Sequence, residues 1–255
     1  MKDCIDHWSY SSAKEIYRKG IDYAVAVKLG IIEKSYGKAV DIGRFVHAVL
    51  LGGDQEFVVS PFKDFRTKEA REWRDSQTLT ILNEDEFEQI TKIADRIKSH
   101  KLAFELLCGE GVKNEVRLEA KIDGKQWVGY ADSLKVAKDG KFEYVADLKT
   151  TAKFDDFRRD AFRNDYDLQA AVYHLITSTS NKPFYWVIAE TIPPFRVGVA
   201  VASQEFEENG YRKLQTICEE IQSFDARNGE NDLLKLNFNQ NESLDDLLLI
   251  GDWSL

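Results

Sequence analysis

Two charged side chains, Asp147 and Lys149, stand two residues apart in an otherwise apolar segment of the chain. Residues 145–151 have the composition of a buried β-strand, and alternation along a strand would point both side chains to one face. A carboxylate and an ammonium are costly to bury unless they pair, bind a metal or take part in chemistry. A plain salt bridge and an active site are therefore the two interpretations of this segment.

Two further strand candidates precede this segment, and each carries one acidic residue of interest. Residues 114–122 alternate polar and apolar side chains and include Glu115, and the Asp-Gly pair at 123–124 is a two-residue hairpin signal. Asp132 interrupts the aromatic and apolar run of the return strand, residues 126–136, where an unneeded charge would be costly. We therefore expect three consecutive antiparallel strands that bring both acids to the sheet edge of the aspartate–lysine pair.

The three acids would supply grouped carboxylate oxygens, which suit magnesium or manganese, whereas zinc prefers histidine and thiolate ligands. The chemistry that needs such a group beside a lysine is phosphodiester hydrolysis. One or two divalent ions polarise the scissile phosphate, lower the pKa of the attacking water and neutralise charge on the leaving oxygen. A lysine at the same place can orient or deprotonate that water, or stabilise the pentavalent phosphate.

The order of these segments, together with others along the chain, resembles the PD-(D/E)XK nuclease superfamily. Within it, the chain is most similar to the RecB-like exonucleases of the RecE type (exodeoxyribonuclease VIII) found in phages and prophages. The segments that carry the resemblance are residues 43–50, the strand of Glu115, and residues 129–132, 147–151 and 169–173. Residues 57–61, 66–68 and 252–253 also look like that subgroup. One such motif occurs by chance in many proteins, but five in the family's order are a strong signal.

The resemblance implies a role for each residue around the aspartate–lysine pair and for one histidine. Asp132 and Asp147 would be ligands of magnesium or manganese, and the backbone carbonyl of Leu148 would complete the shell. Lys149 would orient the attacking water, and His47 would be a further ligand reaching in from an N-terminal helix. Taken alone, a histidine in an amphipathic helix is more often a packing residue, so the role of His47 depends on the family pattern.

The acid of the first core strand has two candidates. Glu115 matches the family's acid and would complete the catalytic set with Asp132, Asp147 and Lys149. Glu119 would face the same way along a regular strand and is a rival for the role. The superfamily often has glutamate where this chain has Asp147, although the RecB-like branch commonly uses aspartate.

Four residues are expected to contact DNA, namely Gln169, Tyr173, Arg66 and Lys153. Gln169 and Tyr173 are four residues apart and so share one helix face. The resemblance implies that they border the site and touch phosphates or bases, while the alternative is a tyrosine that simply packs on the sheet. Arg66 and Lys153 belong to two basic series of the chain, each of which can equally be a solvated helix face.

The net charge of −9 argues superficially against a DNA partner, because neutralisation of phosphates by lysine and arginine dominates nucleic-acid affinity. The distribution of charge matters more than the sum. Acidic residues concentrate at the predicted metal site and in residues 83–88 and 243–246, whereas positive charge gathers in residues 63–74 and 149–163. An acidic exterior around a basic channel would limit non-specific binding, which suits an enzyme that acts only at DNA ends.

The length of 255 residues, with 43% apolar content, allows a full core and is near the upper size of one domain. We expect one domain over residues 1–255, with a mainly helical region at 1–110, a nuclease core at 111–225 and a tail at 226–255. No apolar run approaches the roughly 18 residues of a membrane span, and no signal-peptide core is visible, so we expect a cytoplasmic protein without a membrane partner. The three cysteines lack metal-ligand spacing and cannot supply the four ligands of an iron–sulfur cluster.

The remaining pattern alternates helices and strands around the predicted sheet. Ser11 or Ser12 is expected to cap the first helix, and Asn83 is expected to cap a helix that runs to about residue 107. Further helices are expected at residues 37–51, 67–76, 165–177 and 204–224, and further strands at 184–189 and 195–201. These elements predict an α/β fold with a restriction-endonuclease-like core, a mixed central sheet flanked by helices, after a helical N-terminal region.

The resemblance implies a magnesium-dependent exodeoxyribonuclease that hydrolyses linear double-stranded DNA from its ends, 5′ to 3′, in phage-type recombination. It also implies three partners: duplex DNA ends, further copies of the chain in a closed homo-oligomeric ring, and a single-strand annealing protein. A structure-specific endonuclease or a single-strand exonuclease of the same fold is the alternative. A non-catalytic DNA-binding protein is a third interpretation, which nothing in the sequence favours.

Overall fold

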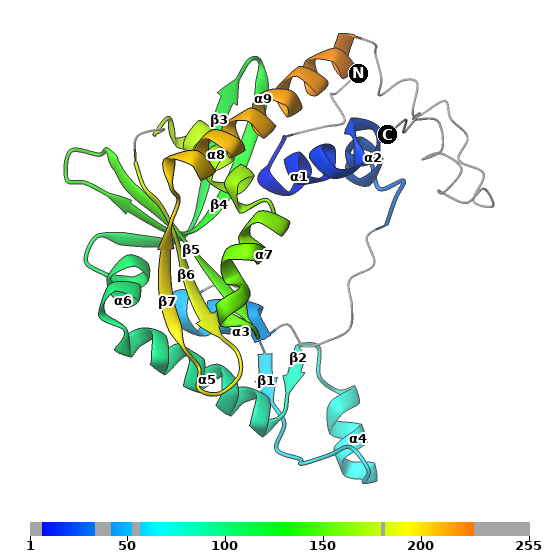
Figure 1. Ribbon diagram of the computed structural model, residues 1–255. Helices are drawn as coiled ribbons and strands as arrows, with labels where there is room; N and C mark the ends of the chain where they lie inside the picture. Colours follow the sequence, from blue (N-terminus) through cyan, green and yellow to red (C-terminus); the bar gives the residue numbers. More distant parts are fainter. Residues whose placement is uncertain (1–6, 34–41, 53–56, 180–181, 227–255) are drawn as a thin grey trace.

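A five-stranded mixed sheet forms the centre of the molecule, in the strand order β3-β4-β5-β6-β7 (Figure 1). The computed structural model describes residues 7–33, 42–52, 57–179 and 182–226. The strands are β3 (Val112–Ile122), β4 (Lys125–Val136), β5 (Phe142–Thr151), β6 (Phe184–Glu190) and β7 (Val197–Val201). Neighbouring strands are antiparallel except β5 and β6, which run parallel. The expected antiparallel meander β3-β4-β5 is therefore present, and the chain then crosses over through helices to β6.

The hairpin between β3 and β4 has the geometry that its sequence demands. Asp123 and Gly124 both have positive φ angles, of 50° and 80°, and Ile122 pairs with Lys125 on either side of them. A two-residue turn with two positive φ angles matches the right-handed twist of the strands, and Asp-Gly is a preferred pair for it. This turn sets the register that places Glu115 opposite Asp132.

One face of the sheet is covered by helices from both ends of the described chain and from the crossover between β5 and β6. They are α1 (Tyr10–Lys19), α2 (Ile21–Lys28), α7 (Phe157–Arg163), α8 (Tyr166–Thr177) and α9 (Gln204–Ala226). Their apolar side chains share one buried cluster with Trp127, Val145 and Trp186 of the sheet. Helix α8 lies between the sheet and α9, so it is the element that reaches the centre of this face.

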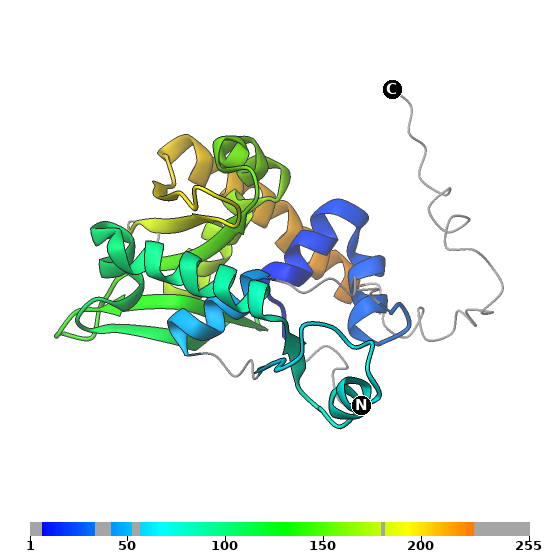
Figure 2. The same ribbon diagram turned by 90° about the horizontal axis from the view of Figure 1, so that it is seen from below.

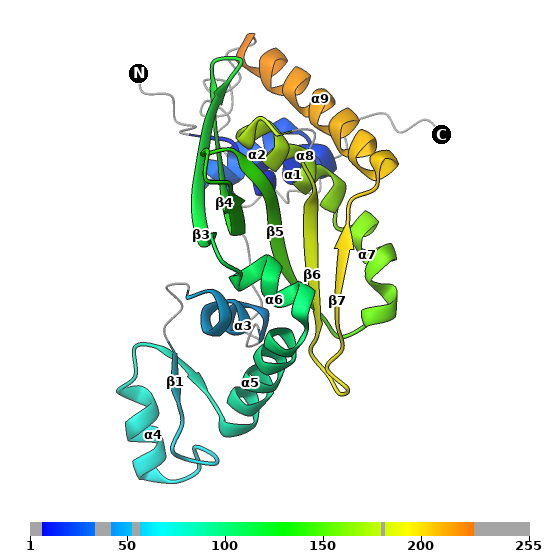
Figure 3. The ribbon, with the colours of Figure 1, turned by 90° about the vertical axis from the view of Figure 1, so that its left-hand side faces the viewer.

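The opposite face of the sheet is covered by α3 (Ile42–Leu51), α5 (Glu84–Ser99) and α6 (Lys101–Cys108). Helices α3 and α5 lie side by side, as Figures 2 and 3 both show. A second buried cluster joins these helices to Ala146, Leu148 and Val187 of the sheet. Strand β5 is thus buried on both faces, with alternate residues in alternate clusters.

The expectation of a single helix from residue 84 to about residue 107 is wrong, because the helix is interrupted at His100. Asn83 caps α5 in a capping box with Glu86, as its position in the sequence predicts. The backbone of His100 is extended (φ −90°, ψ 101°), and its Nδ1 accepts a hydrogen bond from the backbone N–H of Ala103. The same histidine therefore ends α5 and caps α6, and the bend lets both helices bury apolar residues in one cluster.

The first helix also begins differently from the expectation, which placed its cap at Ser11 or Ser12. Ser9 is the N-cap, and Ser12 is the third helical residue whose side chain accepts from the Ser9 backbone. The expected helix at 37–51 is seen from Ile42, and its earlier residues lie outside the described part. Of the tail expected at 226–255, residue 226 ends the last described helix and the rest lies outside the described part. None of the helices in the described ranges combines the length and apolar character that a membrane span requires.

A small lobe extends away from the central sheet in all three views (Figures 1, 2 and 3). It consists of α4 (Lys68–Asp75) between the two short parallel strands β1 (Phe57–Val59) and β2 (Thr80–Leu82). The ring of Trp73 packs against Phe62 and lies parallel to Phe65, with interplanar angles of 62° and 9°. This aromatic packing stabilises the loop before α4, which carries Arg66.

Candidate metal and catalytic site

Alternation along β5 points Asp147 and Lys149 to the face covered by α8. Val145 joins the buried cluster of that face, whereas Ala146 and Leu148 join the cluster of the opposite face. The Nζ atom of Lys149 lies 2.6 Å from Oδ2 of Asp147, as the spacing of the two residues predicts. Both side chains are largely buried: 22% of the Lys149 side chain and 9% of the Asp147 side chain are exposed.

Helix α8 supplies the hydrogen-bond donor that orients Asp147. The Nε2 atom of Gln169 lies 2.6 Å from Oδ1 of Asp147, and Oε1 of Gln169 accepts a 3.3 Å hydrogen bond from the indole of Trp186. Trp186 is also the neighbour of Asp147 on strand β6. The other carboxylate oxygen, Oδ2, is buried and has no hydrogen-bond partner of good geometry among the described residues, although it pairs electrostatically with Lys149. A buried carboxylate oxygen with spare coordination capacity is suited to a cation.

Lys149 is held between Asp147 and an aromatic ring. Its Nζ atom lies 4.9 Å from the centre of the Tyr166 ring, a distance at which the π face attracts a cation. Burial alone would lower the pKa of Lys149, but the Asp147 carboxylate, and after it Tyr166 and Asp132, raise that pKa above its ordinary value. Lys149 therefore carries a positive charge at neutral pH, which suits stabilisation of an anion better than removal of a proton.

A second group of contacts joins β4, β5 and α3. The backbone N–H of Leu148 donates a 2.7 Å hydrogen bond to Oδ2 of Asp132, and the same oxygen lies 3.5 Å from Nδ1 of His47. The Nε2 atom of His47 lies 2.9 Å from the carbonyl oxygen of Leu148. The structure thus brings together His47, Asp132 and Leu148, three of the four predicted metal-ligating residues. The main chain of Leu148 links the side chains of the other two, His47 and Asp132.

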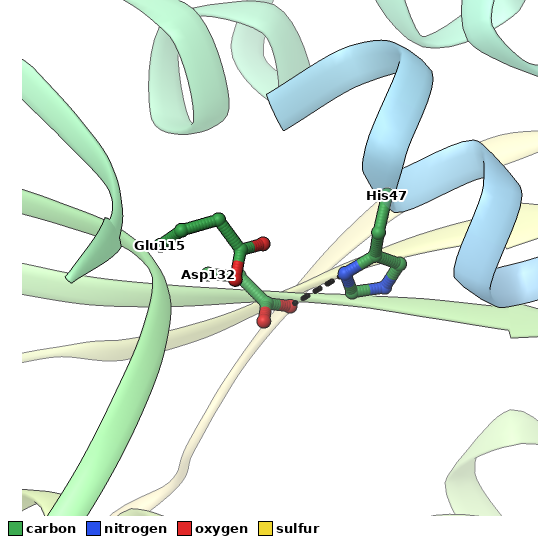
Figure 4. Close-up of side chains that lie close together, drawn as sticks. All are labelled: His47, Glu115 and Asp132. Atoms are coloured by element: carbon green, nitrogen blue, oxygen red, sulfur yellow. Dashed lines mark ion pairs between the residues drawn. The ribbon is translucent and has the colours of Figure 1, made fainter. Parts of the chain in front are cut away.

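Glu115 joins this group through an irregularity in β3. Its φ angle is +50°, a left-handed conformation that is uncommon for a residue in a strand. Glu115 stands opposite Asp132, between the paired positions Asn114↔Ser133 and Val116↔Ala131. One ligand atom each of Glu115, Asp132 and His47 lie within 4.8 Å of one another, and Figure 4 shows the three side chains turned together.

The rival Glu119 lies elsewhere. Its carboxylate pairs with Arg117 and accepts a 3.0 Å hydrogen bond from Gln126, on the exposed surface of the hairpin. Val116 packs in the cluster on the α8 face, yet Asn114 donates to the Leu107 carbonyl at the end of α6, which covers the opposite face. The strand therefore changes its facing at Glu115, and the regular alternation assumed from the sequence does not extend across it.

The donor set fits a divalent cation of the magnesium or manganese type. Burial raises the pKa of Asp132 well above its ordinary value, and the charge of Asp147 raises it further. Burial lowers the pKa of His47, which keeps the imidazole neutral and able to coordinate. Two carboxylates, one neutral imidazole, the Leu148 carbonyl and the Asp147 oxygen that now pairs with Lys149 form a mainly oxygen-rich set. A cation there would offset the repulsion that disfavours the charged form of Asp132.

The four residues expected to contact DNA lie in two kinds of environment. Gln169 and Tyr173 are 4% and 7% exposed, and the Tyr173 hydroxyl donates to the carbonyl of Tyr130. Their polar atoms are therefore bonded inside the protein, behind the aspartate–lysine pair. Arg66 is exposed on the α4 lobe, where it pairs with Asp64, and Lys153 is exposed just after β5. Within the described structure, neither of these two basic residues contacts the His47–Glu115–Asp132 group.

Two residues beside the site were missed by sequence reasoning. Tyr166 contacts Lys149, and Trp186 holds Gln169 and stacks on Tyr166 with an interplanar angle of 18°. Tyr166 stands three residues before Gln169, so helical spacing could have placed both on one face. Trp186 carried no such signal, because an apolar strand resembles any other strand of the core.

Comparisons with known proteins agree with the fold. A model of the family described as a PDDEXK-like domain of unknown function matches residues 9–232. A solved structure from Eubacterium rectale, named "Putative exonuclease", is similar with a TM-score of 0.56 and 17% identity, over 84% of this chain and 82% of that one. The structure of SSO0001 has a TM-score of 0.31 and 13% identity, over 70% of this chain and 84% of that one, too low for an argument. No curated protein matches the chain.

Proposed function

The chain belongs to this PDDEXK-like family, and from that premise we propose that it is a metal-dependent deoxyribonuclease. Family membership and the restriction-endonuclease-like fold, a mixed sheet with helices on both faces, both support a nuclease. The observation that carries the proposal is the convergence of His47, Glu115 and Asp132 beside the Asp147–Lys149 pair. These residues come from α3 and three strands, so only the folded chain assembles them.

The proposed cofactor is magnesium or manganese, as one or two ions. Asp132, Glu115 and His47 would hold it, and the Leu148 carbonyl and Asp147 would complete the set. Such an ion polarises a phosphate and lowers the pKa of a bound water. With the Nε2–H of His47 donated to the Leu148 carbonyl, the lone pair of the neutral ring is on Nδ1, which faces Asp132 and is the atom that would bind the ion.

The residues of the chain divide the remaining work of phosphodiester hydrolysis. Lys149, kept charged by Asp147 and Tyr166, would hold the attacking water and stabilise the negative charge that grows on the phosphate. Gln169 would keep Asp147 in one orientation, since its amide is held by Trp186. Tyr173 would support β4 through the Tyr130 carbonyl, so we propose positioning roles for both residues of this helix face.

The finer part of the proposal concerns the substrate and the assembly. We propose that the enzyme digests linear double-stranded DNA from its ends with 5′ to 3′ polarity, as a ring of identical copies working with a single-strand annealing protein in recombination. The support is the resemblance of the motif order to RecE-type exonucleases. The exposed Arg66 and Lys153 are the proposed contacts with the DNA backbone.

Incubation of linear, nicked and covalently closed DNA with the protein and magnesium tests the proposal. Linear duplex should be degraded from its ends, closed circles should survive, and the Lys149→Ala variant should leave all three intact. Strands labelled at one 5′ end report the polarity, and analytical ultracentrifugation reports the assembly. Cutting of closed circles would favour a structure-specific endonuclease instead. Intact linear DNA after long incubation, with no calorimetric binding of magnesium or manganese, would favour a non-catalytic DNA-binding protein.

A further inference from the structure

A cavity of about 730 Å³ lies on the sheet face that carries Asp147, between α7 and the start of α9. Its aromatic lining consists of Phe157 and Phe162 from α7, Trp186 from β6 and Phe206 from α9, and two arginines, Arg158 and Arg212, line it as well. The volume is within the range of about 300–1,000 Å³ that is typical of small-molecule sites. None of its lining residues belongs to the His47–Glu115–Asp132 group.

The floor of the cavity begins one strand away from Asp147. Trp186 is the strand partner of Asp147, and Ala200 is the partner of Trp186 on β7. Trp186 and Ala200 both line the cavity. Neighbouring strands are about 4.8 Å apart, so the cavity floor extends to roughly 10 Å from the strand that carries the aspartate–lysine pair. A strand of DNA held at Lys149 is therefore within reach of the cavity.

A continuous series of aromatic rings connects the mouth of the cavity with Lys149. Phe162 is 52% exposed and packs edge-on against Phe206, at 4.9 Å between ring centres. Phe206 contacts Trp186, which stacks on Tyr166, the ring that holds the Lys149 ammonium. Because Phe162 is 52% exposed in the described structure, part of its ring offers an apolar surface for a ring-shaped ligand.

The charge at the rim of the cavity is suited to a phosphate. Arg158 has no ion-pair partner within the described ranges, and Arg212 bonds only to the Glu208 carbonyl and the Asn209 side chain. By contrast, the next residue, Arg159, pairs with Asp156 at 2.8 Å and does not line the cavity. Glu205 is the one acidic residue of the lining, so the two arginines leave an excess of positive charge.

We propose that this cavity binds the unpaired terminal nucleotide of a DNA strand, with its base on Phe162, beside Phe206, and its phosphate at Arg158 and Arg212. The inference rests on the proposed deoxyribonuclease function. Aromatic side chains bind single-stranded nucleic acid through the flat faces of the bases, and arginines bind its phosphates. A base pair inside a duplex is stacked on both faces and a terminal pair exposes only its outer face, so a base that enters the cavity belongs to a nucleotide that has left the duplex.

Fluorescence anisotropy of the full chain, with calcium in place of magnesium to limit cleavage, tests this site. The probes are a blunt duplex and the same duplex with a three-nucleotide overhang whose last base is 2-aminopurine. Wild-type protein should bind the overhang duplex more tightly than the blunt one and should change the 2-aminopurine fluorescence. Phe162→Ala and Arg158→Gln should each weaken overhang binding about tenfold and leave blunt-duplex binding unchanged.

Two matched variants control for general effects. Arg159→Gln removes a neighbouring arginine that does not line the cavity, and Phe104→Ala removes a phenylalanine that is 39% exposed on α6. Both should bind the two duplexes as the wild type does. Because Phe162→Ala also removes packing against Phe206, its thermal unfolding is compared with that of the wild type. A terminal 5-iodouracil, photo-crosslinked to the wild-type protein and located in the peptides of α7 or α9, tests the site without any substitution.

The outcomes distinguish failure of the cavity inference from failure of the deoxyribonuclease proposal. If neither duplex binds, the deoxyribonuclease proposal and this inference both fail. If both bind equally, and Phe162→Ala changes nothing, the cavity inference alone is wrong. If free deoxynucleoside monophosphate competes through Phe162 while overhang binding is insensitive to it, the cavity is a mononucleotide site and the strand-end assignment is overturned. Crosslinks that avoid α7 and α9 would likewise overturn it.

Discussion

The side-chain nitrogen of Gln169 lies 2.6 Å from Oδ1 of Asp147, while its oxygen accepts a hydrogen bond from the indole of Trp186. An indole N–H can only donate, and an ionised carboxylate can only accept. The amide of Gln169 therefore has one orientation that satisfies both neighbours. Because Gln169 is buried, it holds Asp147 in a fixed direction towards Lys149 and the metal-ligating group.

Replacement of Gln169 by alanine should slow DNA cleavage without unfolding the protein. A hydrogen bond to a charged group contributes about 1.5–3 kcal/mol, so loss of orientation should lower the cleavage rate roughly 10- to 100-fold. The measurement is the initial rate on linear duplex with magnesium, with circular dichroism as the check on folding. Gln215→Ala, on an exposed part of α9, is the control and should cleave normally. A Gln169→Ala rate equal to wild type would argue against the positioning role.

Substitutions of Asp147 and Lys149 should separate metal binding from cleavage. Asp147→Ala removes a proposed ligand, so both manganese affinity and cleavage should be lost. Lys149→Ala removes the cation that competes for Asp147 at 2.6 Å, so manganese should bind at least as tightly as in the wild type. Its cleavage should still fall by a factor of about 100 or more, because the charge that stabilises the phosphate is gone. Calorimetry and a cleavage assay on the same preparations measure the two effects.

Near-full cleavage by the Lys149→Ala variant would show that β5 is not part of the active site. Cleavage and manganese binding by Asp147→Ala would do the same. If Asp147 and Lys149 form only a structural salt bridge, both variants should instead lose stability, and neither should change the metal affinity.

Glu115 and Glu119 provide a matched comparison on one strand. Glu115→Gln should weaken manganese binding about tenfold or more, since the carboxylate lies within 4.8 Å of the Asp132 and His47 ligand atoms. Glu119→Gln should bind manganese as the wild type does, because Glu119 pairs with Arg117 on the exposed surface. Titration calorimetry on both variants gives the comparison, and equal effects would contradict the placement of the metal beside the irregularity in β3.

Asp132→Asn should stabilise the protein when no metal is present. Burial raises the pKa of Asp132 in the folded state well above the 3.8 of a free aspartate, so ionising the folded carboxylate costs free energy of folding. That cost is absent below about pH 3.8, grows as the pH rises from there to the folded-state pKa, and is complete above it. The variant, which cannot ionise, should therefore melt at a higher temperature than the wild type at pH 8 in EDTA.

Thermal unfolding at several pH values measures this difference, which should shrink towards acidic pH. Manganese should raise the melting temperature of the wild type far more than that of Asp132→Asn. Asp139→Asn is the surface control and should gain no stability, because its carboxylate is exposed and pairs with Lys141 at 2.9 Å. A wild type that is as stable as Asp132→Asn at pH 8 without metal would contradict the raised pKa.

Local sequence patterns predicted much of the fold, because they depend on contacts between near neighbours. The Asp-Gly turn, the cap at Asn83 and the meander that ends in β5 all follow from residues within a few positions of each other. The break at His100 did not follow, because an extended residue between two helices is stable only when both helices share a buried cluster. Propensity over residues 84–107 favours one continuous helix, and packing against the sheet overrides it.

The sequence by itself determined that Asp147 and Lys149 share one face of a strand, since alternation is a property of the backbone. It also identified the types of ligand that a divalent ion prefers. Only the tertiary structure decided that Glu115 rather than Glu119 joins His47 and Asp132, because the hairpin register places Glu115 opposite Asp132 and Glu119 opposite Val128. Only packing of α8 against β6 placed Trp186 and Gln169 behind Asp147. Such contacts join residues far apart in the chain, and their geometry depends on how whole elements pack rather than on any local pattern.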